Sequence, residues 1–135
     1  MATSKVIYNG FLRTTSTHLK SGEEIVTDAP VDNNGKGEAF SPTDLLATSL
    51  ANCMLTVMGI TSLAHAIELD GTMAEVTKVM AEAPRRVSEI HIEFNFPNSY
   101  SDKQKKILEH AALTCPVAQS LHPDIKKVVN FNWQG

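Results

Sequence analysis

The sequence of 135 residues has little cysteine and no surplus of basic side chains. Two cysteines are too few for a disulfide scaffold, and they cannot form a four-cysteine metal site. Lysine and arginine number 12 against 15 aspartates and glutamates, so the formal net charge is −3 and a nucleic-acid partner is not expected. The remaining composition, 42% hydrophobic and 20% charged, is ordinary for a globular protein. Two cysteines are, however, the number that a thiol–disulfide cycle requires.

The length favours one domain over residues 1–135. The first residues contain no apolar run of the kind found in secretory signals, so a cytoplasmic location is expected. The 23 residues from Leu45 to Ile67 carry no Asp, Glu, Lys or Arg and are long enough to span a bilayer. They include Asn52, His65 and several hydroxyl side chains, which favours a buried central helix over a membrane-spanning one. No membrane partner is therefore expected.

The residue pattern predicts an α+β class with mostly antiparallel sheets, in the order β-β-β-α-β-β-α-α-β. Turn signals at Asn9-Gly10 and Ser21-Gly22 divide the first 28 residues into strands, and a loop rich in turn residues follows over 28–41. The other expected elements are a helix over about 42–67, strands over 73–82 and 87–96, a helix after Ser101, a short helix after Cys115 and a last strand around 129–133.

The central helix has the clearest start in the sequence. Ser41 is a good N-cap, Pro42 fits the first helical position, and Asp44 at the third position completes a pattern like a capping box. The helix is apolar on nearly every side, so it needs cover on both sides. So short a chain has few elements left to provide that cover, and we therefore predict a homodimer.

The two cysteines lie in different local settings. Cys53 is expected in the middle of the central helix among neutral neighbours, where the helix dipole gives little help to a thiolate. Cys115 precedes Pro116 at the expected start of a helix, where backbone N–H groups stabilise negative charge. Local chemistry therefore predicts that Cys115 is the more acidic thiol. It leaves open which cysteine reacts first, and a role as buried, inert side chains stays an alternative for both.

A metal or hydrolytic site is a further alternative. Cys115 with His110 and His122 offers three ligand types, but their spacing matches no compact zinc motif. A cysteine–histidine hydrolase also needs a third group to orient the histidine, and no residue in the sequence indicates one. The sequence therefore does not favour a metal or hydrolytic site, which stays an alternative.

Two motifs resemble those of a known family. They are Ser41-Pro42-Thr43-Asp44-Leu45-Leu46, which continues to Ala51-Asn52-Cys53, and Thr114-Cys115-Pro116-Val117. Both are similar to the cysteine motifs of the OsmC/Ohr family, the osmotically inducible protein C and organic hydroperoxide resistance proteins. Segments 27–30, 35–40 and 84–86 resemble an OsmC-like subgroup. The resemblance covers nearly the whole chain, and it implies an intertwined homodimer whose sheets wrap around two central helices.

The resemblance also implies a reaction. Family enzymes reduce organic hydroperoxides with two cysteines, which makes Cys53 the attacking thiol and Cys115 the resolving one, with a lipoyl- or thioredoxin-like dithiol as reductant. Arg13 matches the arginine that accompanies the first cysteine. Typical members hold this arginine with a glutamate where this chain has Thr43, and Glu38 in the preceding loop is the candidate replacement. The alternative is a protein of the same fold that binds a small apolar or electrophilic ligand without efficient peroxidase activity.

Overall fold

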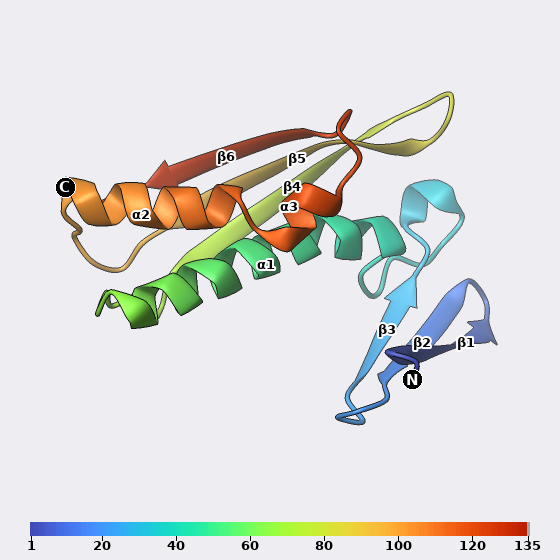
Figure 1. Cartoon of the computed structure of the whole chain (residues 1–135). Helices are drawn as coiled ribbons and strands as arrows, with labels where there is room; N and C mark the ends of the chain where they lie inside the picture. The colour runs from blue at the N-terminus through green and yellow to red at the C-terminus, as the bar shows by residue number, and fades with distance from the viewer. Residues whose placement is uncertain (135) are drawn as a thin grey trace. The chain divides into compact units, whose positions relative to one another are not determined.

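The computed structural model describes residues 1–134, which form two compact units, Met1–Leu46 and the chain from Ala47 onward. Each unit contains one three-stranded sheet (Figure 1). The elements follow the order expected from the sequence, with one short 3₁₀ helix, η1 (Val31–Asn33), added in the loop after the third strand. The predicted α+β class is therefore confirmed.

The first unit is built on a meander of β1 (Ser4–Gly10), β2 (Arg13–His18) and β3 (Glu24–Asp28). Both strand pairs are antiparallel. In the second pair the register places Arg13 directly opposite Asp28. Residues directly opposite each other in an antiparallel pair project from the same face of the sheet, so the register alone brings these two side chains together.

The loop after β3 folds back onto the end of that strand. The Gly37 N–H donates to the Ala29 carbonyl at 3.2 Å, and the Asp28 N–H donates to the Phe40 carbonyl at 3.0 Å. Gly35 passes so close to Ala29 that a Cβ at position 35 would lie 1.7 Å from the Ala29 carbonyl oxygen. Only glycine, which has no Cβ, permits this approach.

Helix α1 (Pro42–Ala64) begins at the predicted residue. The Asp44 N–H donates to Ser41 Oγ at 3.0 Å, and the Ser41 N–H donates to an Asp44 carboxylate oxygen at 3.0 Å, so the predicted capping pattern is confirmed. The helix ends earlier than the expected residue 67. Ala66 adopts a left-handed φ of 53°, and the Ile67 N–H donates to the Ser62 carbonyl at 2.9 Å, which closes the helix without a glycine.

The second unit contains β4 (Met73–Ala81), β5 (Arg86–Asn95) and β6 (Lys126–Asn132). β4 pairs with β5 antiparallel, and β6 pairs with β5 parallel. A parallel neighbour needs a long crossover, and α2 (Asp102–Leu113) with α3 (Pro116–Ser120) provides it. The sheets are thus mostly antiparallel, as predicted, with one parallel pair between β5 and β6.

The core of the second unit lies between its sheet and the helices α1 and α2, which run along one face of the sheet (Figure 1). Apolar and polar residues alternate along β5, and its apolar side chains are buried while the intervening polar ones are not. Phe94 is fully buried and stacks on Phe131 with ring centroids 5.4 Å apart. The helices contribute Leu50, Met54, Met58, Leu108, Ala111 and Ala112 to the same cluster.

Helix α1 has one buried and one exposed apolar face. It is long and apolar enough to cross a membrane, but core helices of soluble proteins share these properties. Met54 and Met58 pack into the core, while Ile60 and Leu63 are exposed, Leu63 to 88%. The prediction of a central helix therefore holds for one side of α1, and its other side lacks cover within this unit.

Candidate active site

The two cysteines of the second unit lie next to each other as free thiols. Cys53 is half-buried on α1, and Cys115 is fully buried at the N-cap of α3. The Val117 N–H donates to Cys53 Sγ at 3.5 Å, and the Ala118 N–H donates to Cys115 Sγ at 3.4 Å. These two N–H groups belong to adjacent residues, so the two sulfur atoms lie at the same end of α3. Two side chains 62 positions apart in sequence therefore share one site at the start of α3.

The expected acidity of Cys115 is wrong. Burial raises the pKa of the Cys115 thiol, and the neighbouring Cys53 thiol raises it further. The Ala118 N–H acts in the opposite direction but does not outweigh the burial. A helix of five residues contributes only a small dipole, whereas full burial removes the water that would solvate a thiolate. Cys115 is therefore a protonated thiol at neutral pH.

The difference in exposure predicts the order in which the thiols are alkylated. With fully reduced protein at neutral pH, iodoacetamide is expected to modify Cys53 several-fold faster than Cys115, because Cys115 is fully buried and its raised pKa disfavours the thiolate. Peptide mass spectrometry over a time course gives both rates. The protein unfolded in urea is the control, in which the rates should converge. Equal rates in the folded protein would contradict the prediction.

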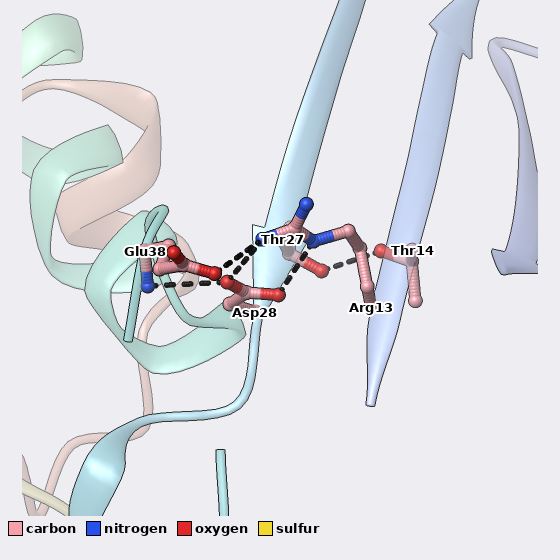
Figure 2. Close-up of polar contacts among 5 residues, drawn as sticks. All are labelled: Arg13, Thr14, Thr27, Asp28 and Glu38. Carbon is pink, nitrogen blue, oxygen red and sulfur yellow. Dashed lines mark hydrogen bonds and ion pairs between the residues drawn. The ribbon is translucent and has the colours of Figure 1, made fainter. Parts of the chain in front are cut away.

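Arg13 is held by two carboxylates within the first unit (Figure 2). Its Nε donates to one oxygen of Asp28 at 2.8 Å, and its Nη2 donates to the other oxygen at 2.7 Å. Nη2 also contacts Glu38 Oε1 at 3.3 Å. The Asp28 carboxylate is 2% exposed, whereas that of Glu38 is 62% exposed. Asp28 therefore makes the shorter, better-shielded pair.

The structure places Glu38 in contact with Arg13, but the main partner of Arg13 is Asp28, which the sequence analysis did not name. Asp28 occupies the last position of β3, directly opposite Arg13. Asp28 could have been predicted as the partner of Arg13 only from the register between β2 and β3, which the sequence does not reveal. Next to the pair, the hydroxyls of Thr14 and Thr27 hydrogen-bond to each other (Figure 2). Thr43 contacts the Ser41 hydroxyl at 3.2 Å at the start of α1.

The Arg13–Asp28 pair predicts a specific loss of stability in acid. The hydrogen bonds from Arg13 hold the pKa of the Asp28 carboxyl below its ordinary value of 3.8. In the unfolded chain the carboxyl titrates at its ordinary value, so the stabilisation is complete above that value and is lost as the pH falls through the lowered pKa. Urea unfolding from about pH 5 to about pH 2 is expected to show a smaller acid-induced loss for Asp28→Asn than for the wild type. Parallel curves for the two proteins would contradict this.

Among residues 1–134, no group of three or more His, Cys, Asp or Glu side chains is arranged to hold a metal ion. The candidate reactive groups are a pair of thiols in the second unit and, in the first unit, a guanidinium paired with carboxylates. Two neighbouring thiols can give up two electrons by forming a disulfide, and a guanidinium can stabilise an anion.

Comparison with known proteins identifies the family. A model of the OsmC-like protein family matches residues 35–129, which is more than half of the chain. The chain belongs to the OsmC-like protein family. A crystal structure from Psychrobacter arcticus 273-4, described as an osmotic stress induced and detoxification response protein, is 62% identical to this OsmC-like chain. The alignment covers 98% of this chain and 96% of that one, with a TM-score of 0.95.

More distant OsmC-like structures share the fold. An OsmC-like protein from Mycoplasma pneumoniae is 20% identical, with a TM-score of 0.79 over 98% of this chain and 96% of that one. An organic hydroperoxide resistance protein from Legionella pneumophila is 12% identical, with a TM-score of 0.75 over 98% of each chain. No curated protein matches the sequence. The OsmC/Ohr fold expected from the two cysteine motifs is thus confirmed.

Proposed function

We propose that this OsmC-like protein is a thiol peroxidase that reduces organic hydroperoxides to alcohols. The observation that carries the proposal is the meeting of Cys53 and Cys115 at the start of α3, where adjacent backbone N–H groups donate to the two sulfur atoms. Cys53 is the more exposed of the two thiols, so it is the one that a substrate can reach first. The structure from Legionella pneumophila, which has the same fold, is described as an organic hydroperoxide resistance protein.

In the proposed reaction the Cys53 thiolate attacks the terminal oxygen of the hydroperoxide. The O–O bond breaks, and the alkoxide leaves and takes up a proton to become an alcohol. The sulfur is oxidised by two electrons to a sulfenic acid. Cys115 then attacks the Cys53 sulfur to form a disulfide, and its proton leaves with the hydroxyl group as water. Burial keeps that proton on Cys115 until this step, because it raises the pKa of the thiol.

A dithiol then reduces the disulfide by exchange and restores both thiols. We propose a lipoyl- or thioredoxin-like dithiol for this step, and a cytoplasmic setting, where such reductants keep thiols reduced. The Val117 N–H, which already donates to Cys53 Sγ, lies where it stabilises negative charge on that sulfur. Arg13 is proposed as the cation that favours the Cys53 thiolate, with its guanidinium held by Asp28 and Glu38.

The two units are proposed to act as one domain of residues 1–135 within an intertwined homodimer. The support is apolar surface that the chain leaves uncovered. Ile60 and Leu63 are exposed on α1, and in the first unit Val6, Ile7 and Tyr8 on β1 are all more than half exposed. Apolar surface of this extent marks an interaction site, and a second copy supplies the missing cover. Light scattering is expected to give twice the mass of one chain.

The test of the proposed reaction is stoichiometric. Reduced protein is mixed with one equivalent of cumene hydroperoxide and then quenched with an alkylating agent. We expect one equivalent of cumyl alcohol and a disulfide between Cys53 and Cys115, seen as a linked peptide in mass spectrometry. Protein alkylated before the peroxide is added is the control and should form neither product. Unchanged hydroperoxide with both thiols still free would favour a ligand-binding protein with inert cysteines.

A further inference from the structure

The guanidinium of Arg13 needs a fixed partner if it is to act on a thiolate. Arginine has a long side chain with several rotatable bonds, and its side chain here is 41% exposed. Arg13 also lines a small pocket of about 150 Å³ with Lys36 and the turn residues Asn9, Gly10 and Phe11. An open cation of this kind would sample many orientations unless a neighbouring group holds it.

Asp28 has the geometry to hold it. Its two carboxylate oxygens accept from Nε and Nη2 of Arg13 at 2.8 and 2.7 Å, which is a two-point pair. Such a pair fixes the plane of the guanidinium as well as its distance. Asp28 is itself fixed, because it lies at the end of β3 opposite Arg13 and is only 2% exposed.

Asp28 also connects the strand to the loop that follows it. One of its carboxylate oxygens accepts from the Glu38 N–H at 3.1 Å, and its own N–H donates to the Phe40 carbonyl at 3.0 Å. The same residue therefore holds the guanidinium and the segment that carries Glu38. The charged groups around it are Arg13 and Lys36, which favour its carboxylate, and Glu38, whose backbone N–H also does so.

We propose that Asp28 is the positioning residue for Arg13. This inference rests on the proposed peroxidase function. Asp28 does not touch the peroxide and acts only through Arg13. Glu38 supplements the pair through one contact at 3.3 Å, and its exposed carboxylate is screened by water.

The first test compares the rate of cumene hydroperoxide consumption across pH in the wild type and in Asp28→Asn. Misplacing a catalytic cation lowers a rate by about 10- to 100-fold, and we expect a loss of this size in Asp28→Asn. The pH at which the rate reaches half its maximum is expected to move upward, because a mobile guanidinium favours the thiolate less. Glu38→Gln is expected to show a loss of roughly threefold at most, since its contact is exposed.

Glu24→Gln is the matched control, since Glu24 is another β3 carboxylate directly opposite a β2 residue and accepts from Thr17 Oγ1 at 3.2 Å. It should leave both the rate and the pH profile unchanged. A purely structural role for Asp28 would lower the melting temperature without moving the pH profile. An unchanged profile in Asp28→Asn, or a larger loss in Glu38→Gln, would overturn the inference.

A second measurement does not depend on activity. In ¹⁵N-edited NMR spectra the Nε–H of a fixed arginine exchanges slowly with water and gives a resolved signal. We expect this signal for Arg13 in the wild type and in Glu38→Gln, and its loss in Asp28→Asn. A wild type that consumed no hydroperoxide would refute the proposed function. Persistence of the Arg13 signal in Asp28→Asn would refute the positioning role of Asp28, whatever the activity.

Discussion

Replacing Cys53 by serine is expected to lower the rate of organic hydroperoxide consumption by at least about 1,000-fold, because the attacking nucleophile is removed. Serine keeps the size and polarity of the side chain, so the packing of α1 against α3 should persist. The rate is measured with cumene hydroperoxide and an excess of a dithiol. Circular dichroism and the melting temperature check that the variant is folded. A Cys53→Ser variant as fast as the wild type would refute the proposed reaction.

Cys115→Ser is the matched control, because it also replaces one thiol by a hydroxyl. Here the first step remains possible, so we expect one equivalent of alcohol per active site in a single fast turnover. The Cys53 sulfenic acid should then accumulate, since no second thiol can condense with it. A sulfenic-acid trap such as dimedone, followed by mass spectrometry, should label Cys53. Trapping at Cys115 of the Cys53→Ser protein instead would reverse the assigned roles.

Truncating Phe94 is expected to have the largest effect on stability. Phe94 is fully buried on β5 and stacks on Phe131, so Phe94→Ala removes apolar contacts and leaves a cavity. The free energy of unfolding should fall by about 3–5 kcal/mol. Urea denaturation monitored by the fluorescence of Trp133 measures the change.

Two further variants make that measurement specific. Phe94→Leu keeps most of the apolar volume and should cost about 1.5 kcal/mol or less if the core repacks. Phe40 is about half exposed in the loop before α1, and Phe40→Ala should change the free energy of unfolding by no more than about 1 kcal/mol. Similar losses at positions 40 and 94 would show that the core does not centre on Phe94.

Local rules predicted the elements of the fold well. Ser41 caps α1 as predicted, and α2 begins after Ser101, as expected, with Ser101 as its N-cap. The strand expected over 87–96 is β5, and the alternation of apolar and polar residues along it matches its buried face. These signals are carried by residues only a few positions apart. They therefore depend little on the rest of the chain.

The site was harder to predict, because it depends on distant contacts. The pairing of Arg13 with Asp28 requires the register of β2 and β3, which is fixed by a turn of five residues, 19–23, rather than by a two-residue turn of known geometry. The pKa of Cys115 depends on burial by elements far away in sequence, so a helix-start argument gave the wrong direction. The meeting of the two cysteines came from the family resemblance and not from local pattern.

The close passage of Gly35 over Ala29 also limits how this sequence can diverge. Any other residue at position 35 would place a Cβ 1.7 Å from a backbone oxygen, so a single substitution there cannot be accommodated without moving the main chain. Exposed neighbours such as Asp32 and Asn33 face no such barrier. A lineage that loses this glycine must rebuild the loop and find a new way to hold Glu38 beside Asp28. The glycine thus constrains the evolution of an arginine site to which it contributes no side chain.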